Sequence, residues 1–193
     1  MHTEFFAHII NKTPSAISQE IKRIDTRPDI VDKKERIGDW EGDTIIGSDK
    51  TKRLITSVER KSGYGIIEKI DIVSAINMHK ILQRSFKRIS KSKRYTFTYD
   101  NGTELGKEDS DLEKKIHMDV YRAHPYHSWE RGCNENFNGL VRTFFPKKTD
   151  FGMVSIENVK HVQYLLNHRP RKRLGYLTPH EVFFGIIPSK LFD

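Results

Sequence analysis

The stretch DWEGDTIIGSDKTKRLITSVERKSGYGIIEKIDI, residues 39–72, decides the fold. Its apolar and β-branched residues fall into three short runs, at 40–46, 53–60 and 64–72, separated by clusters that contain Gly and Ser. Such runs are typical of β-strands, and Gly and Ser favour turns between them. Because connections this short join neighbouring antiparallel strands, the stretch predicts a three-stranded antiparallel meander.

Helices and strands alternate after this meander. Ser74 is positioned to cap a helix that runs to about Ile89, with apolar residues at helical spacing. The remaining predicted elements are a strand at 95–99, a helix at 103–116, a strand at 118–123, helices at 129–145 and 155–167, and a short helix opened by the capping box at 178–181. A meander followed by strand–helix–strand crossovers predicts an α/β fold, a mixed five-stranded sheet with flanking helices.

The chain divides into three segments by pattern. Residues 1–24 contain helical spacing but are too few to bury a core of their own. Residues 25–38 are rich in charge and include Arg27-Pro28, which favours extended backbone, so we expect a linker there. Residues 39–193 form the predicted compact domain.

Composition limits the classes of function. The 193 residues are 36% hydrophobic, which is enough for one domain with a short appendage. No run approaches the roughly 20 apolar residues of a membrane span, and no basic-then-apolar leader opens the chain, so we expect neither a membrane protein nor a secreted one. The single cysteine, Cys133, excludes a disulfide scaffold and a cysteine-clustered zinc site. The formal net charge of +8 favours a polyanionic partner.

Three acidic residues stand where this order of elements can bring them together. Asp43 lies in the first strand, Asp100 follows the fourth strand, and Glu135 lies on the helix after the fifth. Grouped carboxylates repel one another unless a cation neutralises them, and oxygen-only ligands favour Mg²⁺ or Mn²⁺. Two such ions about 4 Å apart activate the attacking oxygen and stabilise the leaving oxygen in phosphoryl transfer.

Spacing alone leaves other acids open as members of this group. Asp39, Glu41 and Asp43 point to the same face of a regular strand, so Glu41 could replace Asp43 by pattern. Glu130 competes in the same way with Glu135. The chain has 26 acidic residues, most of them expected to be solvated surface charges, so the pattern does not choose among these alternatives.

The residues around the acids form distinctive motifs. They are GDWEGDTI at 38–45, DNGTE at 100–104, SWERG at 128–132, NENFNGL at 134–140, FPK at 145–147, TDF at 149–151, LNHRPRK at 166–172, LGY at 174–176 and TPHEVF at 178–183. In this combination they resemble the catalytic domain of DDE transposases of the insertion-sequence-thirty family, which share the retroviral-integrase (ribonuclease H-like) core. The resemblance runs from about Arg27 to Phe184 and covers most of the chain.

This resemblance implies a fold, a reaction and a site. The expected fold is the ribonuclease H-like mixed sheet, and the expected reaction is metal-dependent cleavage and transfer of DNA strands in transposition. Asp43, Asp100 and Glu135 would be the catalytic, metal-binding residues, holding two Mg²⁺ or Mn²⁺ ions. The 34 residues between Asp100 and Glu135 are close to the spacing familiar in integrases.

Basic residues complete the expected site. Arg142 follows Glu135 by seven residues, which places both on one face of a helix, where a cation can contact a DNA phosphate. Phosphate contacts of this kind make binding dependent on salt. The other expected DNA-binding residues are Lys147, Arg169, Arg171, Lys172 and Arg173.

The resemblance extends to the start of the chain. Residues 13–23 are similar to the recognition-helix end of the family's helix-turn-helix, so we interpret residues 1–24 as a remnant of that DNA-binding region. Far fewer residues separate this helix from the catalytic domain than in full-length members. Three hypotheses therefore stay open: a transposase, which this shortening could inactivate; a truncated, non-catalytic DNA-binding remnant that interferes with intact transposase; and a stand-alone nuclease of the same fold.

The resemblance also implies partners and a location. The expected partners are DNA, as element ends and target, and further copies of the chain in a homo-oligomeric active complex, with no membrane involved. The expected location is the bacterial cytoplasm, at the nucleoid when DNA is bound.

Overall fold

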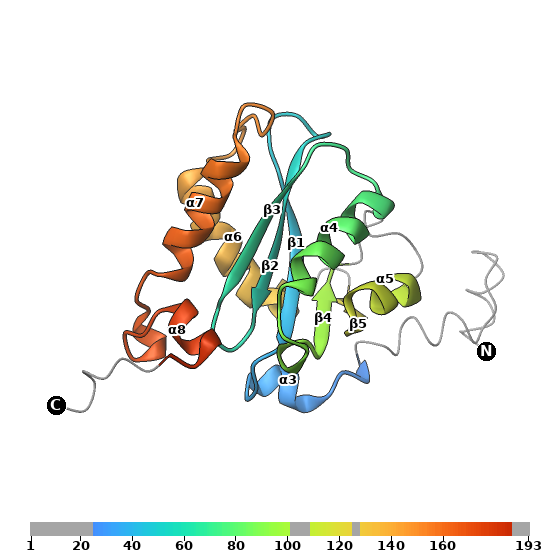
Figure 1. The fold of residues 1–193 in the computed structure, drawn as a ribbon, viewed down its shortest axis with the longest axis vertical. Coiled ribbons are helices and arrows are strands. Elements are labelled where there is room, and N and C mark those ends of the chain that lie inside the picture. The colour runs from blue at the N-terminus through green and yellow to red at the C-terminus, as the bar shows by residue number, and fades with distance from the viewer. Residues whose placement is uncertain (1–24, 101–108, 125–127, 187–193) are drawn as a thin grey trace.

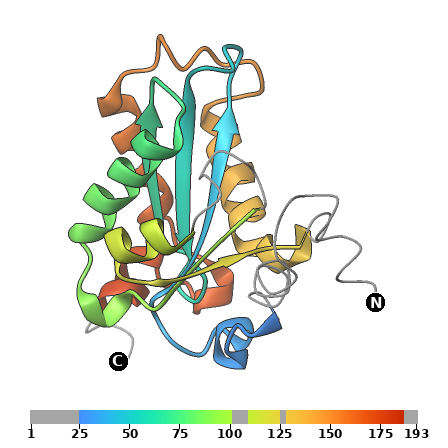
Figure 2. The same cartoon turned by 90° about the vertical axis from the view of Figure 1, so that its right-hand side faces the viewer.

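A five-stranded mixed sheet runs through the middle of the molecule, with helices on both faces (Figures 1 and 2). The structure is a computed structural model that describes residues 25–100, 109–124 and 128–186, so the predicted helix-turn-helix remnant at 1–24 lies outside the described residues. The strands are β1 (Asp39–Ile46), β2 (Arg53–Glu59), β3 (Gly65–Ile70), β4 (Thr96–Tyr99) and β5 (Asp119–Arg122). Their order in the sheet is β3-β2-β1-β4-β5.

The pairing of the strands confirms the predicted topology. β1, β2 and β3 form the antiparallel meander, while β4 pairs in parallel with β1 and β5 pairs in parallel with β4. The parallel pairs arise because the helices α4 (Ala75–Lys87) and α5 (Asp109–Ile116) carry the chain back across the sheet before β4 and β5. The predicted α/β fold, a mixed five-stranded sheet with flanking helices, is therefore confirmed.

The helices form one layer on each face of the sheet (Figure 1). The helices α4 (Ala75–Lys87) and α5 (Asp109–Ile116) cover one face, and α6 (Gly132–Phe144) and α7 (Ile156–Asn167) cover the other. The short helices are α3 (Asp29–Lys33), α8 (Pro179–Phe184) and the 3₁₀ turns η1 (Lys91–Lys93), η3 (Ser128–Arg131) and η4 (Lys172–Leu174).

Each face of the sheet has its own hydrophobic core. Trp40, Phe86 and Phe97 belong to the core beneath α4 and α5, and Trp40 packs edge-on against the Phe86 ring. Ile45 and Val141 belong to the core beneath α6 and α7. Trp40 and Ile45 lie in the same strand and face opposite ways, as the alternation of side chains along a strand requires. This alternation also decides which acids of β1 face α6.

Local signals in the sequence account for several helix boundaries. The Ser74 side chain accepts a hydrogen bond from the Asn77 amide and caps α4, as predicted. At α8, Thr178 and Glu181 form the predicted reciprocal capping box, with Pro179 in the first turn. The predicted helix at 129–145 is divided instead, because η3 precedes α6 and the α-helix begins only at Gly132.

Glycine at position 42 lets β1 approach the neighbouring core. A Cβ atom built on Gly42 would lie 2.2 Å from the Phe97 ring, so any larger residue would displace that ring. Gly42 stands between Glu41 and Asp43, whose side chains point to the other face of the sheet.

The prediction of an extended linker at 25–38 is wrong for its central part. Residues 29–33 form α3, and Val31 within it is completely buried. Upstream, the Arg27 guanidinium donates a 3.0 Å hydrogen bond to Thr98 Oγ1. The proline at position 28 disfavours helical backbone at the residue before it, while its own φ suits the start of a helix, so the following residues form a helical turn that packs on the domain.

Within the part of the chain that the structure describes, no helix has both the length and the apolar character needed to cross a membrane.

Candidate active site

The register of the two central parallel strands places Asp43 and Asp100 next to each other. In this pairing Asp39 lies opposite Thr96 and Glu41 opposite Thr98. Continuing the register by two residues brings Asp100, directly after β4, opposite Asp43. Adjacent strands are about 4.8 Å apart, and both side chains belong to the face covered by α6. The two acids also line the same small cavity, together with Tyr99.

Asp43 is held by partners from its own strand and from α6. Its Oδ1 accepts a 2.7 Å hydrogen bond from the Thr44 amide, and its Oδ2 accepts one of 3.0 Å from Asn138 Nδ2. Arg131 Nη1 lies 3.6 Å from the same Oδ2. These contacts therefore orient the Asp43 carboxylate without a bound ligand.

The electrostatics of Asp43 show that the three predicted acids share one region. Burial raises the pKa of the Asp43 carboxyl above its usual value, and the nearby Arg131 guanidinium opposes that rise. The negative charges of Asp100 and Glu135 act on the same group and raise its pKa further. Asp43 on β1 thus interacts with a carboxylate at the end of β4 and with one on α6, although both are far from it in the sequence.

Glu135 lies exposed in the first turn of α6, and the sheet holds the start of that helix. No side chain of the helix itself caps α6; instead Glu41 Oε2 accepts a 2.8 Å hydrogen bond from the Asn134 amide. A carboxylate is favourable at a helix N-terminus, where the amide dipoles point toward it. Glu41 therefore sets the position of the turn that carries Glu135.

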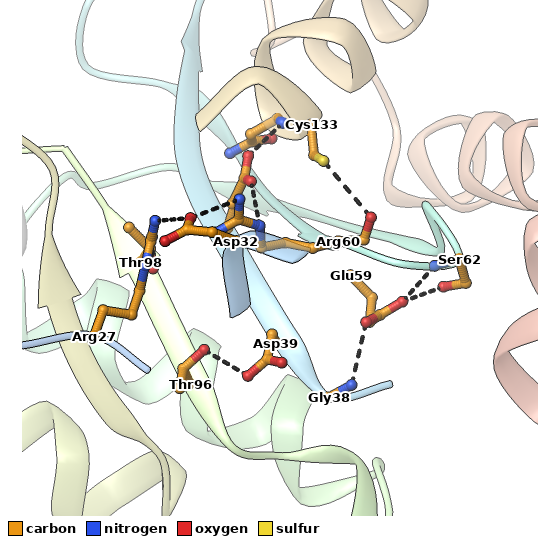
Figure 3. Close-up of polar contacts among 12 residues, drawn as sticks. Arg27, Asp32, Gly38, Asp39, Glu59, Arg60, Ser62, Thr96, Thr98 and Cys133 are labelled. Atoms are coloured by element: carbon orange, nitrogen blue, oxygen red, sulfur yellow. Dashed lines mark hydrogen bonds and ion pairs between the residues drawn. The ribbon is translucent and has the colours of Figure 1, made fainter. Parts of the chain in front are cut away.

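The competing acids have other partners (Figure 3). Asp39 is fully buried and forms an ion pair with Arg36 at 2.9 Å, and its Oδ1 accepts a hydrogen bond from Thr96. Glu41 is also fully buried and lies 3.1 Å from Arg60 Nε. Burial raises the pKa of the Glu41 carboxyl, and the Arg60 charge lowers it again. Neither Asp39 nor Glu41 lines the cavity that Asp43 and Asp100 share.

Glu130, the alternative to Glu135, binds the chain just after β5. Its carboxylate accepts a hydrogen bond of 2.9 Å from the His124 amide and lies 2.9 Å from the Nδ1 atom of the same residue. Glu130 and His124 thus hold each other in place, and Glu130 has a partner other than the three acids.

The expected metal site is chemically suitable but not assembled as a coordination sphere. Carboxylate oxygens from Asp43, Asp100 and Glu135 are the donors that Mg²⁺ and Mn²⁺ prefer. Among the described residues, however, no three His, Cys, Asp or Glu side chains converge closely enough to hold one ion. The chemistry of the donors fits these ions, although the three carboxylates do not form a ready coordination sphere.

Arg142 lies on the same side of α6 as Glu135, but its guanidinium already has partners. Nη2 donates a 2.7 Å hydrogen bond to the Ile46 carbonyl, and Nη1 donates one of 3.3 Å to the Pro146 carbonyl. Partial burial lowers the pKa of Arg142. In this structure the residue joins the end of β1 to the end of α6.

The other predicted DNA-binding residues divide into two places. Lys147 is exposed after α6, whereas Arg169, Arg171, Lys172 and Arg173 lie around η4, beyond α7. Within this second group Arg171 is half-buried and the other three are exposed. The structure thus brings together the three acids but separates Lys147 from the basic residues around η4.

Asn138 and Arg131 are contacts of the site that the sequence did not reveal. Asn138 donates a hydrogen bond to Asp43, and both Asn134 and Asn138 accept hydrogen bonds from Thr56 Oγ1. Their i, i+4 spacing was the available signal, since it places both side chains on one face of α6. No comparable signal singled out Arg131.

Comparison with known proteins agrees with this geometry. No family model matches the chain. It is 44% identical over 164 residues to the transposase for insertion sequence element IS4351 of Bacteroides fragilis, and 34% identical over 175 residues to the transposase InsI for insertion sequence element IS30A of Escherichia coli (strain K12). The chain is similar over most of its length to insertion-sequence transposases of the IS30 type. The two matches cover 85% and 91% of this chain but only 50% and 43% of those relatives, so it spans about half the length of the IS30-type proteins it matches.

Solved structures support the fold independently of sequence. The catalytic core domain of BIV integrase superimposes with a TM-score of 0.58 at 16% identity, covering 78% of this chain and 95% of that one. A chain of the simian T-cell lymphotropic virus intasome in complex with PP2A regulatory subunit B56 gamma gives a TM-score of 0.64 at 16% identity, covering 80% and 56%. This chain, which is similar in sequence to IS30-type transposases, therefore has the fold of an integrase catalytic core.

Proposed function

We propose that this chain is the catalytic part of a transposase that cleaves DNA strands and joins them to target DNA. The observation that carries the proposal is the grouping of three carboxylates from distant segments, with Asp100 in register opposite Asp43 and Asp43 within electrostatic reach of Glu135. The similarity to IS30-type transposases over 85% to 91% of the chain supports it.

In this proposal the three carboxylates hold two Mg²⁺ or Mn²⁺ ions. When bound, the ions would activate the attacking oxygen and stabilise the leaving oxygen of the scissile phosphate. Asp43 and Asp100 contribute from adjacent strands, and Glu135 contributes from α6. Asn138 and Arg131 orient the Asp43 carboxylate and offset part of its charge. Glu41, acting through the Asn134 amide, is a positioning residue for Glu135.

The DNA contacts and the assembly are part of the same proposal. We assign DNA phosphate contacts to the basic residues named above, because point charges and guanidinium forks match phosphate oxygens. The Ile46 and Pro146 carbonyls take two of the five guanidinium N–H donors of Arg142, so donors remain for a phosphate. The active complex would contain several copies of the chain on element ends and target DNA, at the bacterial nucleoid.

Nicking of supercoiled plasmid tests the chemistry. We expect nicking by the wild-type chain with Mg²⁺ or Mn²⁺, none with a chelator, and none by Asp100→Asn. Asp119→Asn is the matched control, since Asp119 is an exposed acid at the start of the neighbouring strand β5. Equal residual activity in wild type and Asp100→Asn would contradict the enzyme hypothesis and leave the DNA-binding remnant.

A second assay separates a transposase from a stand-alone nuclease. A pre-cleaved element end with a free 3′-hydroxyl is incubated with target plasmid, and joined products are measured. We expect joining by the wild type and by Asp119→Asn but not by Asp100→Asn. Nicking without joining would favour the nuclease hypothesis.

A further inference from the structure

A cavity of about 200 Å³ lies beside α6, on the flank that faces away from the three carboxylates. Cys133, Asn136 and Leu140 line it from the helix. Each residue of an α-helix turns the chain by about 100°, so Glu135, two residues after Cys133, points to the opposite flank. The cavity is therefore separate from the candidate active site, although the same helix forms a wall of both.

The charged residues that line this cavity are all basic. They are Lys34, Arg60, Arg171 and Arg173, and they come from the segment before β1, the end of β2 and the η4 region. Because these segments approach from different directions, the cations surround a volume rather than form a flat patch. Such an arrangement fits a compact anion with oxygen acceptors on several sides.

Arg60 is the buried member of the group. Only 6% of its side chain is exposed, with Nε 3.1 Å from Glu41 and Nη2 3.4 Å from Asp32 (Figure 3). Its Nη1 is buried and has no hydrogen-bond partner among the described residues. Buried polar groups in folded proteins nearly always have a partner, so the unpaired Nη1 leaves Arg60 with hydrogen-bonding capacity that Glu41 and Asp32 do not use.

Backbone contacts hold the two arginines of the η4 region in place. Arg171 Nη2 donates a 3.1 Å hydrogen bond to the Leu166 carbonyl, and Arg173 Nη1 donates one of 2.9 Å to the Lys61 carbonyl. Arg173 also lies directly over Gly63, where a Cβ atom would come within 2.3 Å of its Nη2. Burial lowers the pKa of Arg171, and the like charges of Arg169 and Arg173 lower it further. The cations are thus fixed close together despite their repulsion.

We propose that this cavity binds a backbone phosphate of a DNA strand, as a second anchoring point apart from the carboxylate site. The inference rests on the proposed function in taking DNA as the substrate. It adds a second place where the protein contacts a DNA strand, apart from the reacting phosphate. Arg60 connects the two places, because it pairs with Glu41, whose carboxylate holds the start of α6.

Salt-dependent DNA binding tests this proposal. The full chain carrying Asp100→Asn, which keeps the DNA intact, is titrated by fluorescence anisotropy with a labelled short duplex of mixed sequence over a series of salt concentrations. The cavity variants are Lys34→Gln and the double variant Arg171→Gln/Arg173→Gln. Lys50→Gln is the matched control, since it removes one exposed positive charge in the turn between β1 and β2.

The slope of log affinity against log salt counts the phosphates that are neutralised. We expect it to fall by about one for the double variant, because one phosphate contact is lost, by less for Lys34→Gln, and to stay unchanged for Lys50→Gln. Arg171→Lys/Arg173→Lys keeps the charges and is expected to restore most of the slope. Urea unfolding of each variant identifies any loss that comes from misfolding, and the Lys34 variant leaves both η4 arginines intact.

Three results would overturn the proposal. The first is a slope for the cavity variants equal to that of Lys50→Gln. The second is stabilisation of the wild type, but not of the double variant, by inorganic phosphate with no change in the DNA slope, which would make the cavity a site for a free anion. The third is absence of DNA binding by the wild type. If the slopes change as expected but plasmid nicking fails, the cavity proposal stands and the proposed catalysis falls.

Discussion

Glu41 and Asp43 lie two residues apart on the same face of β1 and have opposite surroundings. Glu41 is completely buried, but Arg60 and the Asn134 amide compensate its charge. Asp43 has Arg131 at the longer distance of 3.6 Å and lies within reach of two further negative charges. The comparison teaches that burial alone does not distinguish the two acids. What distinguishes them is that the protein compensates the charge of Glu41 more fully than that of Asp43.

The largest expected effect comes from the uncompensated acid. Asp43→Asn removes one charge from the three-carboxylate group, so we expect strand cleavage to fall on the order of 10⁴-fold or more, in line with the loss of a central catalytic group. Folding should be preserved, because the amide keeps the shape of the side chain and relieves repulsion. Plasmid nicking and urea unfolding measure the two quantities. A variant that nicks normally would remove Asp43 from the site.

For the compensated acid, Glu41, we expect the main effect of a substitution to be on stability. Glu41→Gln leaves Arg60 buried without its closest carboxylate, and breaking a buried ion pair in this manner costs about 3–5 kcal/mol in the free energy of unfolding. Urea denaturation measures this loss, with the exposed-acid variant Asp119→Asn as control. A loss below about 1 kcal/mol would mean that water reaches Arg60 and that the contrast with Asp43 is not one of burial.

A smaller effect is expected from the residue that orients Asp43. Asn138→Ala removes the 3.0 Å hydrogen bond to the Asp43 carboxylate, and we expect a 10- to 100-fold loss of metal affinity or cleavage, as for other residues that hold a metal ligand. Raising the Mg²⁺ concentration should recover part of the activity, which a merely destabilised variant would not show. Asn158→Ala, an exposed asparagine in the first turn of α7, is the control.

The smallest effect concerns a buried acid that only hydrogen bonds compensate. Glu59 accepts hydrogen bonds from the Gly38 amide and from the amide and hydroxyl of Ser62, yet burial raises the pKa of its carboxyl above the usual 4.5. Because the folded state binds the proton more tightly than the unfolded state, the contribution of Glu59 to stability is complete below pH 4.5 and falls as pH rises through the higher folded-state value.

Glu59→Gln therefore tests the balance between burial and hydrogen bonding. We expect the variant to be about 1 kcal/mol less stable than the wild type at acidic pH, from weaker hydrogen bonds, and the difference to shrink as pH rises. Urea unfolding at a series of pH values measures this. A difference that grows with pH would show that the hydrogen bonds outweigh burial and that the pKa of Glu59 is lowered.

Much of the fold could be predicted from local patterns. The three strands of the meander, the Ser74 cap and the Thr178 capping box follow from residue spacing and turn chemistry, which act over a few residues. The extended linker was mispredicted because the burial of Val31 and the bond from Arg27 to Thr98 depend on contacts across the fold. Long-range partners of this kind leave no periodic signal.

In the candidate site, too, some residues could be predicted from the sequence and others could not. The motifs around Asp43, Asp100 and Glu135 selected these acids by resemblance, and the strand order explained how the first two could meet. The roles of Asn138, Arg131 and Arg60 were not predictable, since each depends on a partner at least 19 residues away in the sequence.

The order of strands and helices, the caps and the segments that carry the acids were determined by the sequence alone, because hydrophobic periodicity and turn chemistry operate between near neighbours. Only the tertiary structure decided which acids of β1 are compensated, what holds the start of α6 and which cations surround the cavity beside it. Charges interact through space and lose strength with distance and solvation, so their partners are known only once the chain has folded.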